Sequence, residues 1–236
     1  MVIQILNDNI IQELPLDEQN NIIDSTQKRK IISFQDTISE YTLDFKQSVA
    51  FEVMASSFIL KSLEMHNITQ KSIEMYFKAN ETKKCECINS LSQLKKSMKK
   101  KGGTEDLVMF LSGMGGTGKS EVIKAFVMFV TNISHLFNWN YDSDTIKITA
   151  LTGSAACQIP NGRTLHSQAC LNTKKIGQAA VDSWKSTKML IIDEVSFLNE
   201  DTLEKLDKKM RLLKECDVMF GGVNIVFVGD FFKCYQ

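Results

Sequence analysis

The chain has 236 residues, with 28 lysines and arginines against 28 aspartates and glutamates, so its formal net charge is zero. This balance excludes the global positive field that many proteins use to attract nucleic acid or anionic membranes, so any polyanion must be bound locally. A hydrophobic fraction of 43% permits a substantial core. No apolar run approaches the ~20 residues of a membrane span, and the six cysteines are scattered. We therefore expect a soluble protein with reduced thiols and no membrane contact.

The first 104 residues divide by composition into three segments. Residues 1–40 form an N-terminal extension. Residues 41–77 are helical, because the apolar positions of 42–65 recur at helical spacing. Residues 78–104 are polar and lysine-rich and include a glycine pair, which predicts a flexible insertion. Its lysines can contact phosphates, but such runs are more often solvated surface. Cys85 and Cys87 lack the second ligand pair of a zinc site.

Residues 105–236 alternate between short apolar runs and helical stretches. Four apolar runs predict buried strands at 106–112, 145–151, 188–193 and 224–230. Helices are expected between them at 119–137 and 199–216, the second with its acids first and its bases later, as the helix dipole favours. This alternation predicts an α/β domain with a parallel sheet and helices on both faces.

The stretch FLSGMGGTGKSEV (110–122) concentrates glycines between a predicted strand and a predicted helix. Glycine permits positive φ and close approach, so successive N–H groups can surround a polyphosphate at the helix N-terminus. A lysine adds a mobile positive charge, and the hydroxyl of a serine provides a ligand for Mg²⁺. A merely flexible loop is the alternative. The candidate phosphate ligands are Gly113, Gly115, Gly116, Thr117, Gly118, Lys119 and Ser120.

A second motif, MLIIDEVSFL (189–198), supplies carboxylates at the end of another predicted strand. Open α/β sheets bind ligands at the carboxyl ends of their strands. Asp193 is therefore expected to hold Mg²⁺ together with Ser120, and Glu194 to position and deprotonate the attacking water. Two solvated acids at a strand end are the alternative. Together the two motifs predict a nucleoside triphosphatase core.

The motifs, in their order and spacing, resemble superfamily-1B DNA helicases of the Pif type, relatives of RecD and of the helicases of Helitron transposons. The resemblance rests on GMGGTGKS, TALTGSAACQIPNGRTLHS (149–167), IIDEVSFL and VGDFF. Upstream, LDFKQSVAFEVM resembles the Q-motif of that family, which implies that Gln47 contacts the adenine edge; an ordinary exposed helix residue is the alternative. The resemblance covers about residues 40–236, except the insertion, and implies a RecA-like domain.

The resemblance implies an enzyme that uses ATP and Mg²⁺ to translocate on single-stranded DNA from five-prime to three-prime and to unwind duplexes. It places Thr149, Thr152 and Gly153 along the DNA path with His166 nearby, and Asp230 in the nucleotide site. Hydroxyls and backbone N–H groups contact phosphates without reading sequence, and an imidazole can stack on a base. A purely structural histidine is the alternative for His166.

Two departures from the family pattern bear on activity. Lys233 stands where the family has a glutamine that senses the γ-phosphate, so sensing is expected to differ. The family continues into a second RecA-like lobe with an arginine finger, so we interpret the chain as the N-terminal motor lobe, a fragment. The alternatives are a non-catalytic remnant of a mobile-element helicase or a P-loop ATPase of another class. The family implies DNA repair, recombination, telomere maintenance or transposition, in the nucleus or alternatively the mitochondrion.

Overall fold

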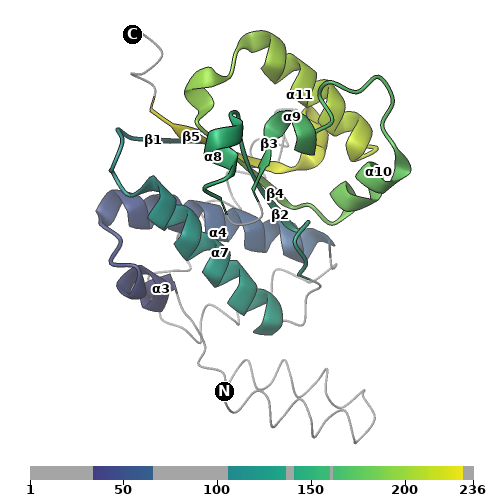
Figure 1. Ribbon diagram of the computed structural model, residues 1–236. Helices are drawn as coiled ribbons and strands as arrows, with labels where there is room; N and C mark the ends of the chain where they lie inside the picture. The colour runs from purple at the N-terminus through teal and green to yellow at the C-terminus, as the bar shows by residue number, and fades with distance from the viewer. Residues whose placement is uncertain (1–33, 66–105, 137–140, 160–161, 231–236) are drawn as a thin grey trace, which may run out of the picture.

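The computed structural model describes residues 34–65, 106–136, 141–159 and 162–230, so the lysine-rich insertion and Lys233 lie outside the described residues. A five-stranded sheet, all of whose strand pairs are parallel, is ordered β1-β5-β4-β2-β3 (Figure 1). The strands are β1 (Val108–Ser112), β2 (Ile146–Ala150), β3 (Arg163–Thr164), β4 (Met189–Asp193) and β5 (Asn224–Gly229). The α/β class predicted from the sequence is confirmed, and β3 is an edge strand that was not predicted.

Helices cover both faces of this sheet. The long helices α4 (Phe45–Met65) and α7 (Lys119–Leu136) lie on one face, and α10 (Gln178–Lys185) and α11 (Glu200–Leu213) on the other (Figure 1). Shorter helices are α3 (Phe34–Glu40), α8 (Gly153–Ala156), α9 (Leu165–Gln168), η1 (Val195–Phe197) and η2 (Met219–Gly222). Within the described ranges, none of the helices combines the length and hydrophobicity needed to cross a bilayer.

Strand β4 shows why a strand in the middle of this sheet is rich in apolar residues. Met189 and Ile191 belong to the core beneath α4 and α7, whereas Leu190 and Ile192 belong to the core beneath α10 and α11. All four have no exposed surface. A strand that is buried on both faces favours apolar residues at successive positions, because successive side chains point to opposite sides.

Aromatic rings join α3 to the larger helices. Phe34 of α3 is 2% exposed, and its ring centroid lies 5.7 Å from that of Phe51 and 5.0 Å from that of Phe129. All three pairs among these rings meet edge to face, the geometry that aromatic pairs prefer. The helix at residues 34–40, within the segment assigned from the sequence to an N-terminal extension, is therefore packed against the core.

Lys214 donates hydrogen bonds to backbone carbonyls just before β4 and so stabilises the connection from α10 to that strand. Its Nζ donates to the carbonyl oxygens of Trp184, Lys185 and Thr187 at 2.9, 3.0 and 3.1 Å. These oxygens belong to the end of α10 and the turn after it, where the last carbonyls of a helix lack their usual partners one turn on; that of Trp184 also accepts from the N–H of Thr187. Replacement of Lys214 by methionine keeps most of the stem and removes three donors, so we expect a loss of about 1–3 kcal/mol in the free energy of unfolding.

The pH dependence of this loss follows from the burial of the ammonium group. Burial lowers the pKa of Lys214 to about 8, against roughly 10.4 in an unfolded chain. Between these values the unfolded chain binds more protons, so the contribution of Lys214 to stability rises with pH. The difference in the free energy of unfolding between wild type and Lys214→Met, measured by urea denaturation, should increase from pH 8 to pH 10. The control is the exposed Lys205 of α11, the helix that ends just before Lys214. An equal loss of stability in Lys205→Met would contradict the role given to Lys214.

Candidate nucleotide site

The candidate residues gather at one edge of the sheet, where the parallel strands end. The phosphate loop (Gly113–Ser120) follows β1, Asp193 is the last residue of β4, and Asp230 follows β5 and is half-buried. Since β5 lies between β1 and β4, these three segments are neighbours. This is the edge at which open parallel sheets bind ligands.

The phosphate loop has positive φ at two of the three glycines expected to adopt it, and Gly115 does not. Gly116 and Gly118 have φ of 78° and 76°, which side-chain-bearing residues rarely adopt. A Cβ on Gly113 would lie 2.5 Å from Oγ1 of Thr117, so the loop is too tight there for any side chain. Lys119 begins α7, and its Nζ donates to the carbonyl oxygens of Gly113 and Met114 at 2.6 and 2.8 Å. The ammonium group therefore lies over the loop.

Gln47 contacts this loop from the start of α4, 70 residues upstream. Its Nε2 donates to the carbonyl oxygen of Thr117 at 3.1 Å. The approach requires glycine at the next position, because a Cβ on Gly118 would lie 2.3 Å from Nε2 of Gln47. The structure thus places Gln47 beside the phosphate loop.

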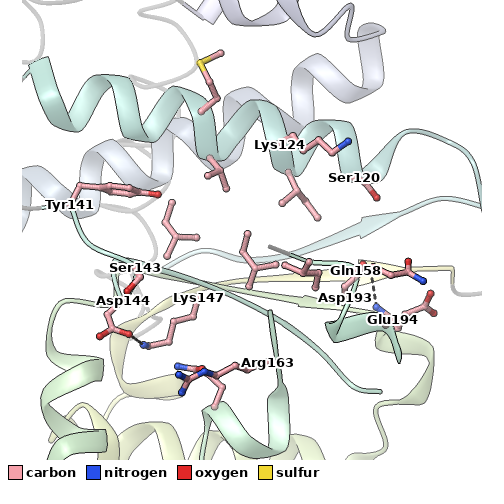
Figure 2. Close-up of a pocket in the computed structure, with 18 of the residues that line it drawn as sticks. Ser120, Lys124, Tyr141, Ser143, Asp144, Lys147, Gln158, Arg163, Asp193 and Glu194 are labelled. Carbon is pink, nitrogen blue, oxygen red and sulfur yellow. Dashed lines mark hydrogen bonds and ion pairs between the residues drawn. The ribbon is translucent and has the colours of Figure 1, made fainter. Parts of the chain in front are cut away.

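Ser120, Asp193 and Glu194 line one end of a cavity of about 1270 Å³. Figure 2 shows Ser120 on α7, facing Asp193 and Glu194 across this end. An Oδ1 atom of Asp193 accepts a hydrogen bond of 2.8 Å from the backbone N–H of Glu194. Glu194 has a left-handed backbone, with φ of 56° and ψ of 41°. Such strain at a non-glycine residue is typical of functional sites.

The donor chemistry of this end of the cavity fits a magnesium ion bound together with a nucleotide. Mg²⁺ prefers oxygen ligands and is usually held by one or two carboxylates, waters and substrate phosphates. Ser120 and Asp193 offer a hydroxyl and a carboxylate. In the part of the chain that the structure describes, no group of three or more histidines, cysteines or acidic residues could hold a metal by itself. An ion at this position would therefore depend on the phosphates of a nucleotide.

The opposite end of the cavity holds Asp144 and Lys147 (Figure 2). These two residues form a polar cluster with Ser183. Lys147 is 4% exposed, and its Nζ donates to Asp144 and to the Ser183 hydroxyl and lies 5.2 Å from the centroid of the Trp184 ring. Burial opposes ionisation of Asp144, but hydrogen bonds from Lys147 and Ser183 outweigh it and lower the pKa of that carboxyl. The buried charge is paired, as stability requires, and the cluster links β2 to α10.

The candidate DNA contacts differ in accessibility. Thr149 lies inside β2 with no exposed surface, and its hydroxyl donates to the carbonyl oxygen of Ile191 at 3.2 Å. In this structure the hydroxyl is therefore engaged within the sheet, and the DNA contact that the resemblance implies for Thr149 stays a prediction. Thr152 caps α8 by accepting a hydrogen bond from the N–H of Ala155. Gly153 is exposed, and His166 is half-buried in α9.

Two residues of the site were not predicted from the sequence. Asp44 precedes α4 and is bonded in both directions to Gln47; its signal was present, since Asp and Gln three residues apart before an apolar run suggest a helix N-terminus. Gly229 ends β5, where a Cβ would lie 2.9 Å from Val195 of η1. That glycine lets η1 pack against the sheet directly after Glu194. This is a tertiary contact, which no local sequence pattern predicts.

Comparison with known proteins identifies the family of the chain that carries this site. Residues 91–235, more than half of the chain, match the model of the PIF1-like helicase family. The chain is 37% identical over 136 residues to the ATP-dependent DNA helicase PIF1 of Emericella nidulans, covering 53% of this chain and 17% of the relative. It is 33% identical over 139 residues to the ATP-dependent DNA helicase RRM3 of Saccharomyces cerevisiae, and this match covers 53% of this chain and 18% of the relative.

A solved structure of unliganded Pif1 from Bacteroides sp is 27% identical, with a TM-score of 0.45, covering 65% of this chain and 32% of that one. The assignment rests on the sequence match and not on this superposition. The family match includes the phosphate loop, the Asp193–Glu194 pair and the residues of α8 and α9. The chain belongs to the PIF1-like helicase family.

Proposed function

We propose that this chain is the N-terminal motor lobe of an ATP-dependent DNA helicase that moves on single-stranded DNA from five-prime to three-prime. The observation that carries the proposal is the convergence of Ser120, the last residue of the phosphate loop, and the Asp193–Glu194 pair on one cavity, with Gln47 held against the loop. The matched relatives are named ATP-dependent DNA helicases, although the chain spans only 17% and 18% of their lengths.

Each residue of the site has a separate task in the proposed reaction. Gly113, Gly115, Gly116, Thr117 and Gly118 surround the phosphates with backbone N–H groups, and Lys119 adds a positive charge. Glu194 orients the attacking water and accepts its proton. Asp230 contributes to the nucleotide site from the end of β5. Ser120 and Asp193 would hold Mg²⁺, which when bound neutralises charge on the phosphate oxygens.

Single-stranded DNA is the proposed partner of the adjacent surface formed by α8 and α9. Gly153 is exposed and Thr152 is half-buried, so backbone N–H and hydroxyl groups there can contact phosphates without reading sequence. His166 can stack on a base. A second RecA-like lobe is the proposed partner for closing the site around ATP. We place the protein in the nucleus, in DNA repair, recombination or telomere maintenance.

The direct test is ATP hydrolysis by the chain with and without single-stranded DNA, with Lys119→Ala as the blank. We expect turnover that DNA stimulates and that disappears in the blank. Hydrolysis that is insensitive to DNA would indicate a P-loop ATPase of another class. ATP binding without turnover, even with a second lobe supplied, would indicate a non-catalytic remnant. Either result contradicts the proposal.

A further inference from the structure

Four lysines form a patch on the side of the sheet that α10 and α11 cover. Lys174 and Lys175 are exposed in the loop between α9 and α10, and Lys205 is exposed on α11. Lys209, one turn after Lys205 on the same helix, is half-buried. These four residues are called the lysine patch below.

A hydrogen bond joins the two parts of the lysine patch. Nζ of Lys209 donates to the carbonyl oxygen of Thr173 at 2.6 Å, which ties the loop to α11 directly before Lys174. An ammonium group has three donors, so two of those of Lys209 remain. Lys205 and Lys209 are four residues apart, and side chains at this spacing are neighbours on the surface of a helix. The loop lysines and the helix lysines therefore lie together.

The lysine patch keeps its positive charge, whereas two other exposed lysines on this side of the sheet are paired. Lys185 of α10 pairs with Asp182, and Lys208 of α11 pairs with Glu204. Among the residues that the structure describes, no carboxylate forms an ion pair with a lysine of the patch. Since the formal net charge of the chain is zero, the patch is a local positive surface, and a polyanion can neutralise it.

The lysine patch adjoins the segment that contains α9. Leu165 of α9 and Leu171 of the turn after it share one hydrophobic core with Leu206 and Met210 of α11. Figure 1 shows α9 and α11 on the same side of the sheet. The loop that carries Lys174 continues directly from this turn. A polyanion bound along α8 and α9 can therefore continue onto the patch.

The spacing of the helix lysines suits a single extended strand. Lys205 and Lys209 are about 6 Å apart along the axis of α11, at the 1.5 Å rise per residue of a helix. This separation is comparable with the distance between successive phosphates of an extended nucleic-acid strand. A lysine binds a phosphate as a mobile point charge, so it needs no fixed orientation of the strand.

We propose that the lysine patch binds the phosphates of single-stranded DNA and extends the track of α8 and α9 over α11. This inference rests on the proposed function, in which single-stranded DNA contacts α8 and α9. The patch adds affinity without sequence preference, because its side chains contact phosphates and not base edges. Lysines that were only solvated would leave the salt dependence of DNA binding unchanged.

The test measures the affinity of the whole chain for a fluorescent oligothymidylate by anisotropy at several salt concentrations. Each lost phosphate contact lowers the slope of log affinity against log salt by about 0.7 for a single strand. The double variant Lys174→Ala with Lys175→Ala should therefore lower the slope by about 1.4 and the affinity in ~0.1 M salt by roughly 10- to 30-fold. Lys205→Ala should lower the slope by about 0.7.

Two further variants separate charge in the lysine patch from total charge. Lys174→Arg with Lys175→Arg keeps both charges and should keep the affinity and the slope of the wild type. The matched control is Lys46→Ala with Lys185→Ala, which removes two charges from exposed lysines of α4 and α10. The control should leave the slope unchanged. Melting temperatures establish that each variant is folded.

The outcomes distinguish this inference from the function on which it rests. Wild-type binding with an unchanged slope in the Lys174 and Lys175 alanine variant, or an equal change in the control, would overturn the inference alone. A loss of affinity for duplex DNA of the same length, with single-strand binding unchanged, would also overturn it. If the wild type binds no single-stranded DNA, the proposed function is wrong and the inference is overturned with it.

Discussion

Replacement of Lys119 by alanine is expected to reduce ATP hydrolysis by at least about 100-fold, the usual cost of removing one preorganised donor from developing negative charge. The Lys119 ammonium already lies at the phosphate loop, 2.6 Å from the carbonyl oxygen of Gly113 and 2.8 Å from that of Met114. Phosphate oxygens compete for the same three donors, so the group needs little rearrangement to bind them. Initial rates of phosphate release measure the effect.

The control for this variant is Lys208→Ala. Lys208 is an exposed lysine of α11 that pairs with Glu204 and is not part of the phosphate loop, so its removal changes the net charge by the same amount. An unfolding titration of both variants establishes that the fold is retained. Equal turnover in Lys119→Ala and Lys208→Ala would show that the phosphate loop is not the site of hydrolysis.

Lys119 could be predicted from sequence because its motif is local. The glycines, the lysine and the serine lie within eight residues, and the flanking strand and helix have clear periodicity. Gln47 lies 70 residues from its partner Thr117, and only the family resemblance suggested its position near the nucleotide. Asp44 carried a local capping signal, but that signal identifies the start of a helix and not a role beside the phosphate loop.

The features that sequence reasoning missed also have physical causes. Thr149, which the resemblance places along the DNA path, lies in a strand that is buried on both faces, so its side chain faces the core. Edge strand β3 has two residues, and α8 and α9 have four each, too few for hydrophobic periodicity to register. Lys147 is buried through ion pairing with Asp144 and a contact with the Trp184 ring, which composition does not reveal.

The second large effect on ATP hydrolysis is expected from a substitution in the Asp193–Glu194 pair. Replacement of Glu194 by glutamine should lower ATP hydrolysis by about 10²–10⁴-fold, the usual contribution of a general base, while ATP binding changes little. The side chains are nearly equal in size, and the hydrogen bond to Asp193 comes from the backbone N–H of residue 194, so it survives. Single-turnover hydrolysis and equilibrium binding of ATP, measured on the same preparations, separate the two effects.

A companion variant, Glu194→Gly, separates catalysis from backbone strain. The left-handed conformation of residue 194 is unfavourable for a glutamate and accessible to glycine. We expect the glycine variant to be as inactive as the glutamine variant without the stability loss usual for truncating a side chain. Turnover that persists in both would show that another group activates the water. If Glu194→Gln also abolished ATP binding, the carboxylate would act in the ground state, with the nucleotide or its metal, and not as the proposed base.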